Sequence, residues 1–197
     1  MTHYTVSLLK DASHPDNQEA IQKVHAKVST LGDQDISVFG LFTPLFGLAT
    51  NELYLVTGAP NAHRIDDALT GSGLGCVQHQ QLLPTVRPTS AAPRRKPGIY
   101  VFRWFTVLQE NVDEIARLSN QAWVTFEGGF ETEVQGLFRQ RDTTAPTGKM
   151  LLLTQYRDLS VWEASRLPPA EARENFARRA RLTIEATPIA TRLVPPT

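Results

Sequence analysis

The pattern of apolar and polar positions predicts alternating strands and helices along the first half of the chain. Residues 2–10 are apolar and β-branched, which is typical of a strand. Asp16 and Glu19 then form a capping box ahead of a helix that Gly32 ends. Apolar residues three and four positions apart give this helix one buried face: Ala20, Ile21, Val24, Val28 and Leu31. The other predicted elements are a strand pair at residues 36–43 and 52–57, a short helix at 61–69 and a closing strand at 76–86.

The second half repeats this order with a longer second helix. Asn111 and Glu114 cap a first helix that ends at Gly128. Its apolar face consists of Ile115, Leu118, Ala122, Trp123 and Phe126. Ser160 and Glu163 cap a second helix, which two prolines interrupt before it resumes over residues 170–181. The predicted strands of this half cover residues 99–107, 131–139, 149–156 and 189–194.

The two halves also match each other directly. Residues 3–42 align with residues 99–138 at a constant offset of 96, without a gap and with nine identities. Unrelated segments of ordinary composition would share about two or three. We therefore interpret the chain as an internal duplication.

The order strand, helix, strand, strand, helix, strand predicts a ferredoxin-like unit, an antiparallel sheet with both helices on one face. One copy leaves its other sheet face uncovered, and that face needs a partner. We expect an α+β protein with two tandem ferredoxin-like βαββαβ units packed sheet to sheet as an intramolecular dimeric α/β barrel. The predicted division is a first unit at residues 1–88, a linker rich in Pro and Arg at 89–97, and a second unit at 98–197.

The second half resembles a known family within this architecture. The matching segments are the strand Ile99–Val107, the run Val134–Phe138, the segment Leu153–Leu159 and the tail Ala190–Pro196. Together they resemble the NIPSNAP family of the dimeric α/β-barrel superfamily. The resemblance implies a ferredoxin-like fold, whereas barrel relatives include small monooxygenases, haem-degrading enzymes, dismutases and isomerases. It therefore selects no single reaction, leaves haem open, and predicts no other cofactor.

Composition narrows the range of partners. Lys plus Arg and Asp plus Glu number 20 each, so a net charge of zero speaks against nucleic acid and anionic membrane surfaces as partners. The longest weakly charged stretch, residues 36–56, is punctuated by Gly40, Pro44 and Gly47, so we expect no membrane insertion. The single Cys76 excludes an internal disulfide. Residues 1–15 lack the pattern of a targeting peptide, and we expect a cytoplasmic protein.

Arg103 is the first candidate ligand-binding residue. It stands in the middle of a strand between Phe102 and Trp104, where a cation is costly unless it is paired. Either it pairs with a carboxylate of the same core, or it binds an anionic or carbonyl ligand. Ser7 occupies the equivalent position in the first half, so we expect at most one half to carry this feature.

Three further residues complete the predicted site. Trp104 is one of three tryptophans in the second half, which either line a pocket for a planar ligand or form core. Tyr156 ends a strand and offers a phenol to the same pocket. His79 is either a base or haem ligand, or a structural histidine.

Two other groups suggest no site. Cys76 and His79 are three residues apart on a strand and should point to opposite faces, so no metal site is predicted. The group Arg178, Arg179 and Arg181 fits the exposed face of an amphipathic helix.

Two hypotheses follow. The first is a NIPSNAP-like barrel that binds a small apolar or aromatic molecule in a pocket between sheet and helices through Arg103, Trp104, Tyr156 and His79. If it is an enzyme, cofactor-independent monooxygenation fits best, although no catalytic residue is assigned. The second is a non-enzymatic interaction or scaffold protein. In both, the chain is a pseudo-dimeric monomer, and further self-association stays open.

Overall fold

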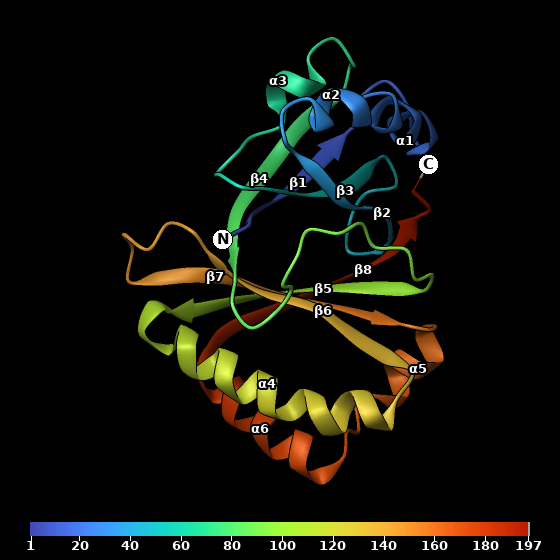
Figure 1. Ribbon diagram of the computed structural model, residues 1–197. Coiled ribbons are helices and arrows are strands. Elements are labelled where there is room, and N and C mark those ends of the chain that lie inside the picture. The colour runs from blue at the N-terminus through green and yellow to red at the C-terminus, as the bar shows by residue number, and fades with distance from the viewer. Residues whose placement is uncertain (197) are drawn as a thin grey trace. The chain divides into compact units, whose positions relative to one another are not determined.

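A computed structural model describes residues 1–196 of the chain (Figure 1). By contacts between residues the chain divides into two compact units. Unit 1 contains residues 1–83, 90–97 and 189–196, and unit 2 contains residues 84–89 and 98–188. The last strand therefore contributes its second part to unit 1, although it follows the helices of unit 2 in sequence.

Unit 1 is a sheet with three short helices on one face (Figure 1). Its strands are β1 (His3–Lys10), β2 (Ser37–Phe46), β3 (Glu52–Ala59), β4 (Gly75–Pro84) and the second part of β8 (Thr183–Val194), in the order β4-β1-β3-β2-β8. Its helices are α1 (Gln18–His25), α2 (Val28–Gly32) and α3 (Asp66–Leu69). The predicted first helix is thus two pieces, because the N–H of Lys27 donates to the carbonyl of Val24 and tightens the chain between them.

The helix-facing side of unit 1 is filled by apolar side chains. Leu9, Leu53 and Leu55 from the strands have no exposed surface, and they belong to the same cluster as Leu31 and Ile65 from the helical side. Each fully buried leucine contributes about 1.5–3 kcal/mol to folding.

Unit 2 has the same strand order with longer helices. Its strands are β5 (Ile99–Leu108), β6 (Thr132–Gln140), β7 (Thr147–Tyr156) and the first part of β8, in the order β8-β5-β7-β6. A 3₁₀ turn (η1, Gln109–Asn111) leads into α4 (Val112–Gly129), and α5 (Leu159–Ala164) and α6 (Ala170–Arg181) follow β7. The break between α5 and α6 lies at the two prolines, as predicted. The strand β8 begins six residues earlier than the sequence pattern indicated.

The two units share details of register. Ser7 pairs with Leu55 and Arg103 pairs with Leu152, so the residues at the offset of 96 hold equivalent places. The pairing of the second strand shifts between Val38 and Gly40 in unit 1 and between Val134 and Gly136 in unit 2. A Cβ on either glycine would lie 2.5 Å from an atom of the phenyl ring two residues later, so each ring requires a glycine there.

A bulge in β4 changes the expected placement of Cys76. The pairing of β1 with β4 shifts between Leu8 and Leu9, so that Ser7 faces His79 and Leu9 faces Cys76. Because Ser7 and Leu9 share a face, Cys76 and His79 share one as well, and the prediction of opposite faces is wrong. Even so, residues 1–196 contain no cluster of three side chains able to hold a metal ion. Within the same residues no helix is long and apolar enough to cross a membrane.

Candidate functional site

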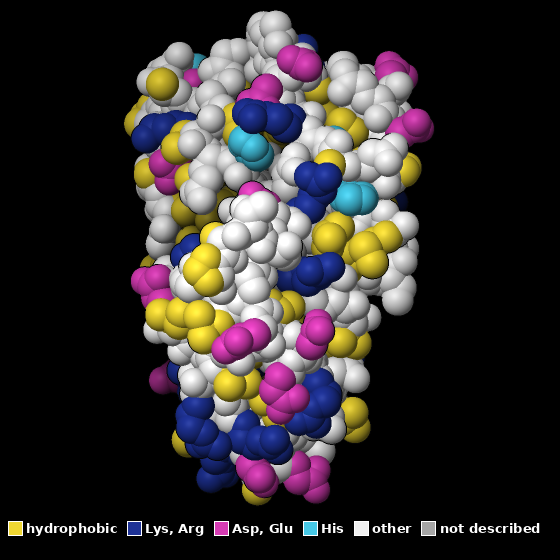
Figure 2. Space-filling model, turned by 90° about the vertical axis from the view of Figure 1, so that its left-hand side faces the viewer, with side chains coloured by type: hydrophobic (Ala, Val, Ile, Leu, Met, Phe, Trp, Pro, Cys, Tyr) yellow, Lys and Arg dark blue, Asp and Glu magenta, His cyan; other side chains and the backbone are white. Residues whose placement is uncertain are grey.

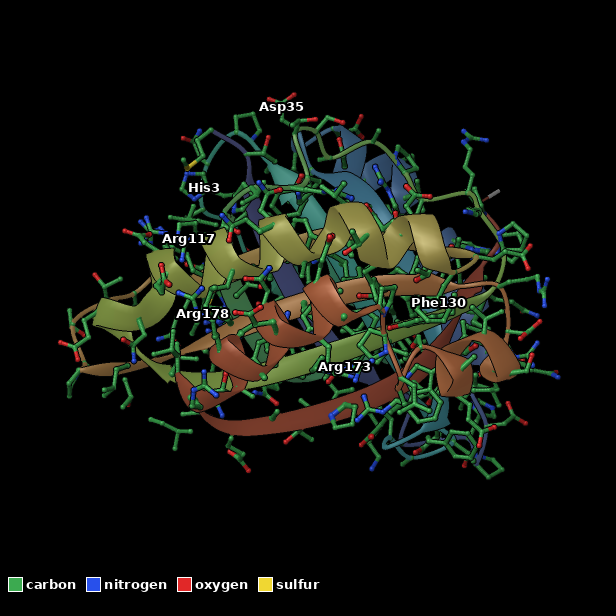
Figure 3. The ribbon with its side chains drawn as sticks, turned by 90° about the horizontal axis from the view of Figure 1, so that it is seen from below. His3, Asp35, Arg117, Phe130, Arg173 and Arg178 are labelled. Carbon is green, nitrogen blue, oxygen red and sulfur yellow. The ribbon has the colours of Figure 1, made fainter. Side chains whose placement is uncertain are left out.

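Unit 2 contains a cavity of about 680 Å³ between its sheet and its helices. The strand β5 contributes Val101, Arg103 and Phe105, which alternate with residues on the other face of the sheet. The helices α4 and α6, which lie side by side in Figure 3, contribute Trp123 and Phe176. The cavity is therefore formed by residues of unit 2 alone.

Arg103 enters the cavity from the sheet without a partner in the protein. Among residues 1–196 no carboxylate pairs with it and no side chain or carbonyl accepts a hydrogen bond from it. Burial lowers the pKa of its guanidinium, with the nearby charge of Arg166 acting in the same direction. The sequence left two interpretations of Arg103, an ion pair with a core carboxylate or contact with a ligand. Among residues 1–196 the structure provides no carboxylate for the ion pair.

A second arginine, more deeply buried than Arg103, lies beside it. Arg179 of α6 is only 6% exposed, and its Nη1 donates to Ser119 Oγ at 3.2 Å. Its guanidinium carbon lies 5.2 Å from the ring centre of Phe105 and 4.7 Å from that of Phe176. Burial lowers the pKa of Arg179 to about 9, and the charge of Arg103 contributes to this shift. Both arginines remain charged at neutral pH.

Tyr156 closes the cavity at the end of β7. Burial raises the pKa of its phenol, while Arg103 and the hydroxyl of Ser165 act in the opposite direction. The phenol is therefore neutral at pH 7 and does not neutralise Arg103. It is a hydrogen-bond donor or acceptor for whatever the cavity holds.

Two tryptophans add further hydrogen-bond donors. The indole Nε1 atoms of Trp123 and Trp162 are buried and have no acceptor among residues 1–196. Arg87 lies over the ring of Trp123 at 4.7 Å and forms two hydrogen bonds with Glu127, at 2.8 and 3.0 Å, which hold that side of the ring in place. Both indoles line the cavity, so their rings provide apolar walls and their N–H groups polar contacts.

The charges around the cavity do not balance. Four arginines line it, namely Arg103, Arg166, Arg173 and Arg179. Glu185 is the only acidic residue of the lining, its side chain is 64% exposed, and it accepts a hydrogen bond from Thr106. The outer surface differs, since Figure 2 shows basic and acidic side chains intermixed over the helices, and Glu114 there pairs with Arg117 and Arg178.

The four predicted site residues are not brought together. Arg103 and Tyr156 line the cavity. Trp104 alternates with Arg103 along β5, lies on the opposite face of the sheet and is not part of the lining. His79 belongs to β4 in unit 1, opposite Ser7.

Sequence reasoning missed Arg179. It was assigned to the exposed helix face with Arg178 and Arg181, and this assignment is wrong. The spacing contains the missing signal, because Ala172, Phe176 and Arg179 are four and three residues apart and share one helical face. Ala172 is fully buried, so a residue in line with it also faces the sheet.

The cavity does not suit haem. Its lining contains no histidine, cysteine or methionine, which are common axial ligands of haem iron. Tyr156 is the one lining residue of a ligating type, and its raised pKa disfavours the phenolate that would bind iron. We therefore derive no chemistry from haem for this cavity.

Comparisons with known proteins identify the fold. No protein-family model and no curated protein matches the chain. Solved structures do: a protein of Lactobacillus acidophilus with the provisional name monooxygenase is 10% identical, with a TM-score of 0.61 over 100% of this chain and 94% of that one. An anthrone oxidase-like protein is 12% identical, with a TM-score of 0.61 over 98% and 91%. A haem-binding protein from Thermus thermophilus is 13% identical, with a TM-score of 0.60 over 98% and 91%.

Likeness at such low identity speaks for the fold and not for an activity. It extends over nearly the whole chain and agrees with the strand order found in each unit. The α+β fold class expected from the sequence is confirmed. The chain has the fold of the dimeric α/β-barrel proteins.

Proposed function

We propose that unit 2 binds a small apolar or aromatic molecule in its cavity, with Arg103 and Tyr156 as polar contacts. The observation that carries this proposal is a cavity of about 680 Å³ beside the apolar cluster of unit 2. Ligand pockets are typically about 300–1,000 Å³, mostly apolar, with a few placed polar groups. Aromatic walls with a phenol and a guanidinium are a composition of this kind.

The proposal can be tested by filling the cavity. Val101→Phe places a ring into the hollow from β5, whereas the same change at Val124, which is 77% exposed on α4, leaves the cavity unchanged. We expect the fluorescence of an aromatic dye, N-phenyl-1-naphthylamine or its sulfonated relative 8-anilinonaphthalene-1-sulfonate, to rise with the native protein and with Val124→Phe. Val101→Phe should abolish the rise. Equal binding by both variants, or no binding of either dye by the native protein, would reject the proposal.

The natural ligand can be sought in the same preparation. Native mass spectrometry and the absorption spectrum of the purified protein should reveal a bound organic molecule. Val101→Phe should carry less of it than Val124→Phe, since only the first change occupies the cavity. Equal loading of the two variants would place the molecule elsewhere.

Cofactor-independent oxygenation is the enzymatic form of this proposal. It is supported by the aromatic lining of the cavity, which contains no histidine or cysteine, and by the likeness to a protein provisionally named a monooxygenase. In such a reaction an activated CH₂ group and one O₂ give a carbonyl group and one H₂O, so the substrate supplies all four electrons. With anthrone as probe, oxygen uptake by the native protein should exceed oxygen uptake by the Val101→Phe variant. Equal rates would reject oxygenation of this probe and leave binding untouched.

Kinship with the NIPSNAP family and an origin by duplication are also part of our proposal. They are supported by the nine identities at a constant offset and by the matching register shifts of β2 and β6. Expressing residues 98–196 alone tests the family view, because a NIPSNAP-like half should assemble as a dimer that covers its exposed sheet face. A soluble monomer would contradict it.

A further inference from the structure

We propose that the molecule bound in unit 2 carries a negatively charged oxygen group on an aromatic body, and that Arg103 and Arg179 bind this group together. This inference rests on the proposed function and specifies the class of ligand. It assigns Arg179, which sequence reasoning placed on the surface, to the binding site.

The first argument is the charge of the cavity. Four arginines and one glutamate line it; Arg166, Arg173 and Glu185 are exposed to solvent, which leaves Arg103 and Arg179 as the charges inside. Two like charges confined in an apolar space repel each other, and burying them without a counterion is costly. An anionic group between Arg103 and Arg179 would supply the missing charge.

The second argument is the number of unused donors. A guanidinium has five N–H groups in a fixed plane, which suits the two oxygens of a carboxylate or sulfonate. Arg179 uses one of them for Ser119, and Arg103 uses none within the protein as far as residue 196. The two side chains therefore present most of their donors to the cavity.

The third argument concerns the body of the ligand. The rings of Phe105, Trp123, Trp162 and Phe176 line the cavity with the arginines, and the phenol of Tyr156 lies at the end of β7. Offset or edge-on contact with these rings favours a planar, aromatic molecule. The buried indole N–H groups of the two tryptophans can donate to a further oxygen on it.

A purely structural role explains less. Arg179 packs on two phenyl rings, and such contacts help to stabilise a buried guanidinium. Arg103 has no ring contact or hydrogen bond of this type among residues 1–196, so packing does not account for its place in the middle of β5. A ligand accounts for both arginines at once.

Two dyes with the same aromatic frame test this inference. 8-Anilinonaphthalene-1-sulfonate is an anion, and N-phenyl-1-naphthylamine lacks the sulfonate. We expect the intact protein to bind the anionic dye at least about tenfold more tightly, the size expected from one charge-assisted hydrogen bond. Arg103→Met and Arg179→Met should each remove this preference and leave the affinity for the neutral dye within about twofold.

The adjacent Arg178 provides the matched control. It is exposed on the same helix, pairs with Glu114 and does not line the cavity, so Arg178→Met should keep the preference. Arg103→Lys retains a charge and should keep part of the preference for the anionic dye. This variant provides the test if a methionine variant fails to fold. Displacement of the anionic dye by 2-naphthoate, but not by 2-naphthamide, would extend the result from sulfonate to carboxylate.

The outcomes separate the two proposals. If the intact protein binds both dyes equally, or if the arginine variants lose both dyes alike, charge recognition is wrong while the cavity still binds ligands. If neither dye binds, the proposed function fails and this inference fails with it. Retention of the preference in both methionine variants would also overturn the inference.

Discussion

An apolar cluster occupies the space between sheet and helices in unit 1, whereas in unit 2 an apolar cluster shares this space with a cavity of about 680 Å³, although the strands share one register. In unit 1 the segment before α3 lies against the sheet. The carbonyl of His63 accepts hydrogen bonds from Thr5 Oγ1 at 3.0 Å and from Gln81 Nε2 at 3.2 Å, and the His63 ring bonds to the hydroxyl of Thr57 at 2.8 Å. The hydroxyls of Thr5 and Thr57, the Gln81 amide and the His63 ring and carbonyl are thus satisfied within the protein.

The equivalent positions in unit 2 carry different residues or have different surroundings. Val101 replaces Thr5, and Thr154, which holds the place of Thr57, lines the cavity. Here the segment between α5 and α6 borders the cavity with Ser165 and Pro168, and the long α6 carries Arg179 and Phe176 over the strands. The comparison teaches that one strand register supports either a sealed core or a binding site, depending on the segment that covers it.

The largest expected effect distinguishes the two cores. Leu55→Ala in unit 1 should lower the free energy of unfolding by about 3–5 kcal/mol, because the side chain is packed on all sides. Leu152→Ala should cost about 2 kcal/mol, since the equivalent leucine already borders the cavity and loses fewer contacts. Urea unfolding of both variants measures the difference. Equal losses would mean that the hollow does not weaken packing around it.

A smaller effect of opposite sign is expected at Arg103. Arg103→Met removes a partly buried charge that has no counterpart in unit 1, where Ser7 stands. Without ligand the variant should be about 1–2 kcal/mol more stable, because an apolar side chain of similar length avoids the cost of desolvation. Thermal and urea unfolding of ligand-free protein provide the measurement. A loss of more than about 1 kcal/mol would instead assign Arg103 a structural role.

The threonine pair should show a difference of at most about 1 kcal/mol. Thr57→Val breaks the hydrogen bond to His63 and leaves the ring without that partner, which costs about 1 kcal/mol. Thr154→Val should cost less than this, because the equivalent hydroxyl lines the cavity and interacts with the phenol of Tyr156 instead of a histidine ring. Free energies of unfolding, compared between the two variants, test this expectation. A larger cost at Thr154 would point to a partner for its hydroxyl that outweighs the one in unit 1.

The smallest effect is a dependence on pH. Burial lowers the pKa of His63 below its ordinary value of 6.5. As the pH falls, the unfolded chain therefore binds a proton at a higher pH than the folded protein does. The stability that neutral His63 contributes is complete above pH 6.5 and falls as the pH drops from there through the lowered pKa. His63→Gln should flatten the stability curve in this window when both proteins are unfolded by urea across the pH range. Parallel curves would show that the His63 ring titrates normally.

Much of the architecture was predictable because it depends on local pattern. The apolar spacing of α4, the proline break before α6 and the Gly-Leu-Phe run at residues 40–42 and 136–138 each follow from steric and hydrophobic rules within one element. Arg103 was conspicuous for the same reason, since a cation in an apolar strand contradicts its surroundings. Tyr156 could be placed because it ends the strand that pairs with β5.

Other features depend on which elements lie opposite each other. Arg179 was assigned to the surface because a run of arginines near a helix end suggests solvent, whereas the helix turns it toward Phe105. The bulge that aligns Cys76 with His79 and the descent of His63 onto the sheet leave no periodic trace in the sequence.

The sequence by itself determined the order of strands and helices, the repeat and the one misplaced cation, because each is encoded in spacing along a few neighbouring residues. Only the tertiary structure decided that Leu55 is enclosed in the apolar cluster of unit 1, while Leu152, in the corresponding cluster of unit 2, also borders a cavity. The reason is physical: local pattern fixes the face on which a side chain lies, but the gap between two packed layers depends on the side chains of both.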